Sequence, residues 1–197
     1  MRAGGIPPRV RPPCRWYYKE WEDPITRRYE DDKAALPFVT NMFRWKKRRP
    51  ETMLVGVAYQ NYFQPEDSGP FFDYEVTRTD LPFFEGTGWK AGDKLKGVLG
   101  YEWDNRDPDG DGSRLWSGQD SMNGEIPKEK LTVLFSGAPV DFTGKKGLAE
   151  AVYWESPAGG KVFASGSIRW DWGLGKPGFE SEPFKIFNRN LVEAFLR

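Results

Sequence analysis

The sequence contains no histidine at any of its 197 positions. Ser-His-Asp and Cys-His nucleophile pairs, HExxH zinc sites and imidazole proton shuttles all need that ring, so each of these chemistries is excluded. An enzyme of this composition has to work with carboxylates, phenols, lysine or a metal held by oxygen. The absence of one residue type therefore narrows the candidate catalytic groups considerably.

Cysteine is almost as scarce, because Cys14 is the single thiol. An internal disulfide framework is excluded, and a reducing compartment is the simplest expectation. The chain also has no run of about 18 apolar residues that could span a bilayer. Residues 1–13 lack the apolar segment of a signal peptide. We therefore expect a cytoplasmic protein.

Neither sign of charge is in excess, since 29 Lys and Arg balance 29 Asp and Glu. No global field would draw the chain to nucleic acid or to an anionic membrane. Residues 44–50 (RWKKRRP) form a basic run with one ring, a pattern that fits a solvated loop better than a nucleic-acid site. The expected partner is a small-molecule substrate or another protein, with no nucleic acid and no membrane.

Aromatic residues, glycine and proline are plentiful: aromatics make up 16% of the chain, with 9 Trp, 22 Gly and 16 Pro. This composition favours short strands joined by tight turns over a helix bundle. Residues 1–13, with four prolines and three arginines, are predicted to be an irregular arm. Residues 14–197 are predicted to form a single domain.

The pattern of apolar residues predicts strands at residues 53–63, 73–77, 96–101, 149–154 and 161–167. A short apolar run bounded by Ser136 and Gly137 predicts another at residues 131–135. Residues 149–154 and 161–167 should pair as a hairpin through the turn at 157–160. Residues 188–197 are predicted to be a helix, with Asn188 as its N-cap. Its apolar stripe would consist of Leu191, Phe195 and Leu196.

Glu102 and Asp104 follow directly after the predicted strand at 96–101. Carboxylates at the carboxyl ends of strands are where α/β folds tend to place their sites. These two residues are therefore the catalytic candidates.

Residues 107–112 spell DPDGDG, which matches the opening of a calcium loop at Asp107, Asp109 and Asp111. The match then fails, because Gly118 stands where the bidentate glutamate should be. A polar turn is the favoured interpretation, and a non-standard calcium site is the alternative.

Residues 159–175 (GGKVFASGSIRWDWGLG) alternate small and apolar side chains in their first half. The second half is expected to set Trp170 and Trp172 on one side of an extended segment, which Gly173 and Gly175 end. The two indoles would either cover a core strand or line a binding surface.

Five motifs in order resemble the C-terminal part of the N,N-dimethylformamidase large (beta) subunit family. The likeness is carried by Cys14 with Tyr18 and Lys19, by residues 21–24 (WEDP), 49–56 (RPETMLVG) and 97–104 (GVLGYEWD), and by residues 162–174 (VFASGSIRWDWGL). The last two are the most specific, because motifs of that length and order would rarely arise by chance.

The resemblance implies an α/β, β-rich fold: the C-terminal portion of a glutamine-amidotransferase-like or trehalose-utilisation-like mixed sheet, with a β insertion and a C-terminal helix. It also implies hydrolysis of small N-substituted amides by a mononuclear iron held by tyrosine phenolates and a glutamate. By motif, Glu102 is the glutamate and Tyr18 the best available phenolate. In an amide hydrolase of this kind, we expect Asp104 to orient the metal. Trp170 and Trp172 would form a substrate wall.

The family's domain begins upstream of the first residue here, so we expect the domain to be incomplete on its N-terminal side. The open sheet edge that results would be covered by a complementary subunit or by oligomerisation. Two alternatives remain: a non-catalytic β-rich binding module with a tryptophan-lined surface, and a calcium-stabilised structural domain.

Overall fold

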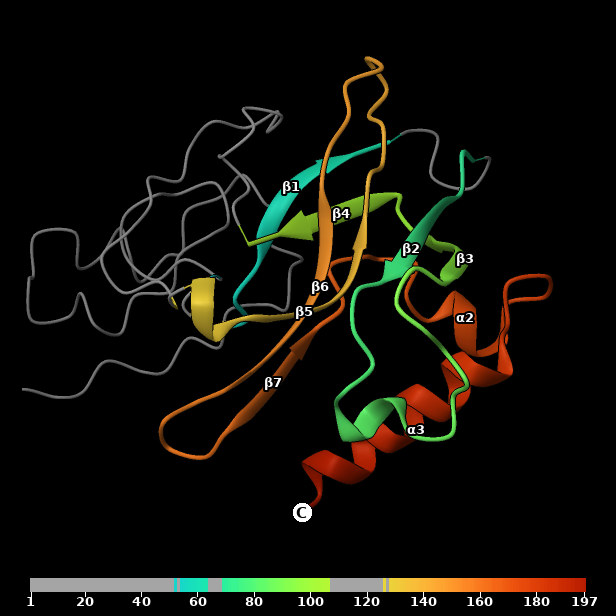
Figure 1. The fold of residues 1–197 in the computed structure, drawn as a ribbon. Helices are drawn as coiled ribbons and strands as arrows, with labels where there is room; N and C mark the ends of the chain where they lie inside the picture. The colour runs from blue at the N-terminus through green and yellow to red at the C-terminus, as the bar shows by residue number, and fades with distance from the viewer. Residues whose placement is uncertain (1–51, 53, 64–68, 107–125, 127) are drawn as a thin grey trace, which may run out of the picture.

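The computed structural model describes residues 52, 54–63, 69–106, 126 and 128–197 (Figure 1). Within these residues the chain is β-rich, with two antiparallel sheets and a C-terminal helix. The smaller sheet pairs β1 (Ala58–Tyr62) with β4 (Glu102–Asn105). The larger has the order β3 (Lys94–Leu99), β2 (Phe72–Val76), β5 (Thr132–Gly137), β6 (Ala149–Glu155) and β7 (Lys161–Ala164).

The short helical elements are η3 (Pro82–Phe84), η4 (Lys128–Lys130) and α2 (Trp172–Gly175). A long helix, α3 (Glu182–Phe195), closes the chain. No helix in the described part of the chain combines the length and the apolar character needed to cross a bilayer.

Most strand predictions are confirmed by the structure. The predicted hairpin is β6 and β7, and its turn is closed by the Ser156 N–H donating to the Gly160 carbonyl at 2.7 Å. The strand predicted at 53–63 is shorter, because the chain turns at Gly56 (φ +80°) before β1 begins. A Cβ at Gly56 would lie 2.4 Å from Leu131 Cδ2, so glycine leaves the room that the Leu131 side chain occupies.

The predicted start of the C-terminal helix is wrong. The helix begins after Ser181, with Pro183 in its first turn, a position where the missing proline N–H costs nothing. Asn188 lies in the middle of α3, where its Nδ2 donates to the Phe184 carbonyl at 2.8 Å. Phe184, Phe187 and Leu191 are the buried face. Of the predicted stripe, Phe195 is 40% and Leu196 82% exposed.

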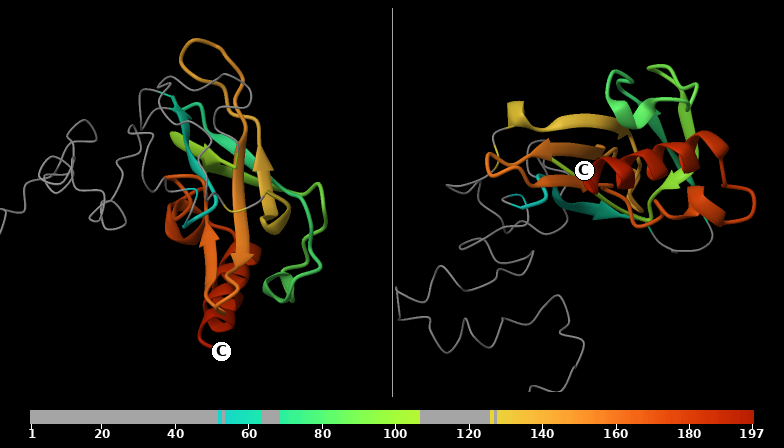
Figure 2. Two further views of the ribbon diagram at one scale, coloured as in Figure 1. Left: turned by 90° about the vertical axis from the view of Figure 1, so that its left-hand side faces the viewer. Right: turned by 90° about the horizontal axis from the view of Figure 1, so that it is seen from below.

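Aromatic rings fill the core between the larger sheet and α3, which lies between β7 and η3 (Figure 2). Phe187 is fully buried at the centre, with its ring 5.1 Å from that of Phe135 and 4.9 Å from that of Phe84. Asn190 ties η3 to the helix by donating from Nδ2 to the Glu85 carbonyl at 2.8 Å. In the described part of the chain, most of these aromatic side chains therefore serve core packing.

Candidate functional site

Glu102 and Asp104 lie inside a strand, which corrects the predicted position after a strand end. β3 ends at Leu99, the chain turns at Gly100 (φ +115°), and β4 begins at Glu102. Because side chains alternate along a strand, Trp103 and Asn105 are buried on one face and the two carboxylates lie half-buried on the other.

A β-bulge in β1 brings two phenols to the face that carries the carboxylates. Tyr62 pairs with Glu102 and Tyr59 with Asp104, and the register shifts by one residue between Tyr59 and Asn61. In a regular strand, residues three apart would point to opposite faces. The extra residue in β1 turns both tyrosines toward the same face, and bulges of this kind are common beside active sites.

Buried amides on the opposite face hold the bulge in place. Gln60 Oε1 accepts from Trp103 Nε1 at 2.9 Å and from the Leu148 N–H at 3.0 Å. Asn61 Nδ2 donates to Asp141 Oδ2 at 2.9 Å. The connection between β5 and β6 is thereby docked onto β1, and both amides are almost completely buried.

Asp141 is the centre of this docking. Its Oδ1 accepts from the N–H groups of Thr143 and Lys145 at 2.8 and 2.9 Å, and from the Thr143 hydroxyl at 2.6 Å. Burial acts to raise the pKa of Asp141, but the hydrogen bonds from Thr143, Lys145 and Asn61 outweigh it and hold the pKa below its usual value.

The motif at residues 162–174 lies along the edge of β4 that does not pair with β1. The Asp104 N–H donates to the Gly166 carbonyl at 3.0 Å, and Trp103 forms a β-bridge with Ser167. The Ser167 hydroxyl accepts from the Gly100 N–H at 3.0 Å and donates to the Val98 carbonyl at 2.9 Å. The two most specific of the five motifs that carry the family resemblance are therefore adjacent in space.

The predicted extended arrangement of Trp170 and Trp172 is wrong. Residues 168–171 form a turn, Trp172 begins α2, and Gly173 and Gly175 lie inside that helix. Trp170 packs into the core, 4.7 Å from the ring of Phe184. Trp172 belongs to a separate cluster with Phe71 and Phe179. Both indoles are only half-buried, so the binding-surface alternative stays open.

Arg169, which sequence analysis overlooked, is 2% exposed and surrounded by rings. Its Cζ lies 4.9 Å from the ring centroid of Phe71, 5.8 Å from Tyr101 and 4.8 Å from Trp172. The available signal was a single arginine close to two tryptophans in the segment SIRWDW. Because arginine is almost never fully buried without partners, such a position indicates a cation stacked on rings.

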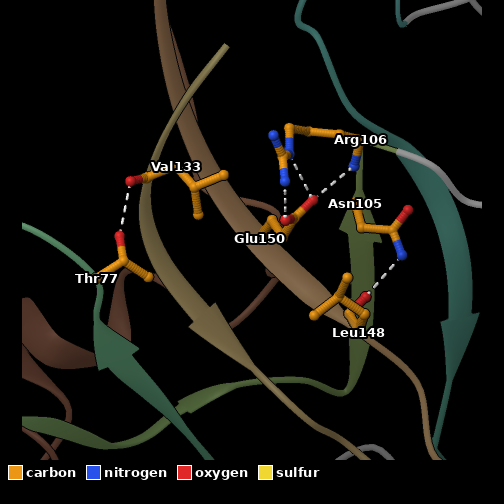
Figure 3. A network of polar contacts seen from close by, with 6 residues as sticks. All are labelled: Thr77, Asn105, Arg106, Val133, Leu148 and Glu150. Atoms are coloured by element: carbon orange, nitrogen blue, oxygen red, sulfur yellow. Dashed lines mark hydrogen bonds and ion pairs between the residues drawn. The ribbon is translucent and has the colours of Figure 1, made fainter. Parts of the chain in front are cut away.

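An ion pair between the partly exposed Arg106 and the buried Glu150 lies beyond the C-terminal end of β4 (Figure 3). Glu150 accepts from three donors of Arg106: Nη2 at 2.8 Å, and Nε and the backbone N–H both at 3.0 Å. The next residue back, Asn105, donates from Nδ2 to the Leu148 carbonyl at 2.9 Å. These contacts attach β4 to β6, and Glu150 is fully engaged in structure.

Tyr74 is a phenol near Asp104 that the structure keeps protonated. Its hydroxyl donates to the Ser165 carbonyl at 2.9 Å, and the side chain is fully buried. Burial first, and then the charges of Asp104 and Glu150, raise the pKa of Tyr74 well above its usual value. This residue therefore serves as a hydrogen-bond donor and not as a phenolate.

The donor set on the Glu102 face fits a hard metal ion in its chemistry, since carboxylate and phenol oxygens are the ligands that Fe(III) favours. Across the described residues, however, no three Asp, Glu or Cys side chains gather as a metal site. Tyr18 lies outside the described residues, as do Asp107, Asp109 and Asp111 of the predicted calcium loop.

The comparison with known families covers the same region. A family model described as N,N-dimethylformamidase beta subunit-like, C-terminal, matches residues 11–182. The chain belongs to this family. No curated protein matches it. The matched residues include Tyr18, Glu102, Asp104, Trp170 and Trp172, and the resemblance to the dimethylformamidase beta-subunit family is confirmed. Family membership associates the chain with an amide hydrolase.

Proposed function

We propose that this chain is the C-terminal domain of a hydrolase of small N-substituted amides, with its site at Glu102. The observation that carries the proposal is the face of the small sheet on which Glu102 and Asp104 stand opposite Tyr62 and Tyr59. Membership of the dimethylformamidase-like family supports the reaction class.

The residues that would hold an iron ion are Glu102 and a phenol. Tyr18 is the phenol that the resemblance implies, and Tyr62 is the phenol that the strand register sets opposite Glu102. When bound, iron would supply Lewis acidity toward the amide carbonyl and toward a water molecule. Asp104, two residues along the same face, is a carboxylate that can accept a proton beside the reacting amide.

Glu102 is well placed for this role because its backbone is held from both sides. The Phe63 N–H donates to the Tyr101 carbonyl at 2.8 Å from the β1 side. From the other side, the Ile168 N–H reaches the Glu102 carbonyl at 3.5 Å, and the Arg169 N–H donates to the Gly100 carbonyl at 2.9 Å. A catalytic carboxylate needs such a rigid support.

The family description names a beta subunit, so we propose that a complementary subunit works with this chain on a small-molecule substrate. We also propose the amidotransferase-like mixed sheet that the resemblance implies. Every strand pair in the described residues is antiparallel, so its parallel strands would lie outside them. A β-rich domain with a C-terminal helix agrees with it only at the coarser level.

The proposal predicts that Glu102→Gln loses iron binding and most of its amide hydrolysis. Removal of a charged ligand should lower dimethylamine release from N,N-dimethylformamide by at least about 100-fold, because even changes behind the ligands cost about 10- to 100-fold. Iron content and amine release would be measured on the purified protein, with any subunit that co-purifies.

Glu193→Gln, an exposed glutamate of α3, is the matched control and should retain both properties. Wild-type protein that binds no iron and releases no amine would contradict the proposal. Quenching of tryptophan fluorescence by amides in such a protein would favour the binding module instead.

A further inference from the structure

Arg169 connects three segments that are distant in the sequence. Its Nη1 donates to the Pro70 carbonyl at 3.3 Å, in the loop before β2. Its backbone N–H donates to the Gly100 carbonyl, in the corner between β3 and β4. The rings around its guanidinium come from the first of these segments, from the residue before Glu102, and from α2.

The guanidinium also packs directly against the corner that precedes Glu102. A Cβ at Gly100 would lie only 3.3 Å from Arg169 Nη1, so the absence of a side chain there leaves room for the cation. Gly100 also has a φ of +115°, which side-chain-bearing residues rarely adopt. Glycine at this position serves both the turn and the packing of Arg169.

Arginine suits this position better than lysine would. A planar, delocalised guanidinium can stack on several rings at once and still donate hydrogen bonds in its plane, whereas an ammonium is a compact point charge. Lys176 provides the contrast: its Nζ also lies over a ring, 4.6 Å from the Trp172 centroid, but the residue is exposed.

We propose that Arg169 is a positioning residue that fixes the Gly100–Glu102 corner and thereby sets the direction of the Glu102 carboxylate. The guanidinium is too deeply buried to touch a substrate, so it acts through Tyr101 and the backbone of the corner. The expected effect on catalysis rests on the proposed function of Glu102. The claim that Arg169 fixes the Gly100–Glu102 corner does not depend on it.

The test compares wild type with Arg169→Lys, Phe71→Leu and the control Lys176→Met. Misplacing a catalytic group by about 1 Å can cost about 100-fold, so Arg169→Lys should lower kcat by about 10- to 100-fold, with KM within about twofold. In 1H–15N spectra the amide signals of Gly100, Tyr101 and Glu102 should shift. Lys176→Met should leave kcat and these signals unchanged.

Phe71→Leu keeps the test decisive if Arg169→Lys fails to fold. Phe71 is 43% exposed, so its replacement removes one ring from the guanidinium at little cost to the core. We expect a smaller fall in kcat and shifts at the same three amides. Melting curves would establish the folded fraction of each variant.

Two results would overturn the inference: wild-type kcat in folded Arg169→Lys with the Glu102 amide unmoved, or a fall in kcat that only tracks the folded fraction. Failure of the proposed function gives a different pattern. In that case wild type releases no amine and binds no iron, while the amide shifts in Arg169→Lys still decide whether Arg169 positions the corner.

Discussion

At the scale of single residues, the site region tolerates little added volume. Gly166 has a φ of +60°, and a Cβ there would lie 2.2 Å from the Glu150 carbonyl oxygen and 3.1 Å from the Tyr74 hydroxyl. Its own carbonyl accepts from the Asp104 N–H, so this backbone cannot move without moving β4. Gly166 therefore sets how closely the motif at residues 162–174 approaches β4, the strand of Glu102.

Gly166→Ala should consequently destabilise the fold by about 2–5 kcal/mol, because the clash is with backbone and the positive φ adds strain. Gly144→Ala is the control, since Gly144 also has a positive φ (+85°) but no atom within 4 Å of the position that a Cβ would take. It should cost about 1 kcal/mol. Urea unfolding of both variants measures the difference, and equal losses would contradict the argument.

At the scale of elements, the bulged strand β1 depends on the connection between β5 and β6. Gln60 and Asn61 occupy the bulge, and their side chains bind Leu148 and Asp141 of that connection. Tyr62 also meets Phe142 of the same connection, with 5.6 Å between ring centroids. The pairing of Tyr62 with Glu102 and of Tyr59 with Asp104 is thus supported by a distant segment, since Asn61 and Asp141 are 80 residues apart.

This docking should be sensitive to acid through Asp141. Its folded-state pKa is below the unfolded value of about 3.9, so the stabilisation is fully present above that unfolded value. It is lost as the pH falls through the lowered folded pKa. Unfolding free energies measured between about pH 2 and 6 should therefore converge for wild type and Asp141→Asn at the acidic end.

Asp141→Asn should be the less stable protein near pH 6 and should lack this part of the pH dependence. A constant difference between the two proteins across the whole range would mean that the Asp141 carboxylate does not control docking. Asp171→Asn, at an exposed position before α2, is the control and should follow the wild-type curve.

At the scale of the whole molecule, one aromatic core unites the larger sheet with α3. Phe187 contacts rings from η3, β5 and β7. Phe187→Ala should cost about 3–5 kcal/mol, because a fully buried ring leaves a cavity that its neighbours cannot fill. Thermal or urea unfolding measures this loss.

Val192→Ala, on the solvent side of the same helix and 58% exposed, should change stability by less than about 0.5 kcal/mol. Similar losses for the two variants would show that α3 is held by something other than its buried face.

The elements that sequence analysis predicted well are those with a strong local signal. The β6–β7 hairpin combines alternation with turn residues, and residues 131–135 form a short apolar run bounded by Ser136 and Gly137, so local pattern was enough to locate these strands. The helix start was misplaced because Asn188 looks like an N-cap, whereas it caps nothing and binds Trp170 Nε1 at 3.0 Å. The segment at 170–172 is a turn followed by the start of α2, because Trp170 packs into the core whereas Trp172 packs against Phe71 and Phe179.

What the sequence determined by itself is the family, through its most specific motifs, the absence of histidine, and most of the strand pattern. Only the tertiary structure decided that β1 pairs with β4, that a bulge at Gln60 turns Tyr59 and Tyr62 toward the carboxylates, and that Arg169 lies beneath the corner. The physical reason is that side-chain period is a local property, whereas strand pairing and register depend on contacts between residues far apart in the chain.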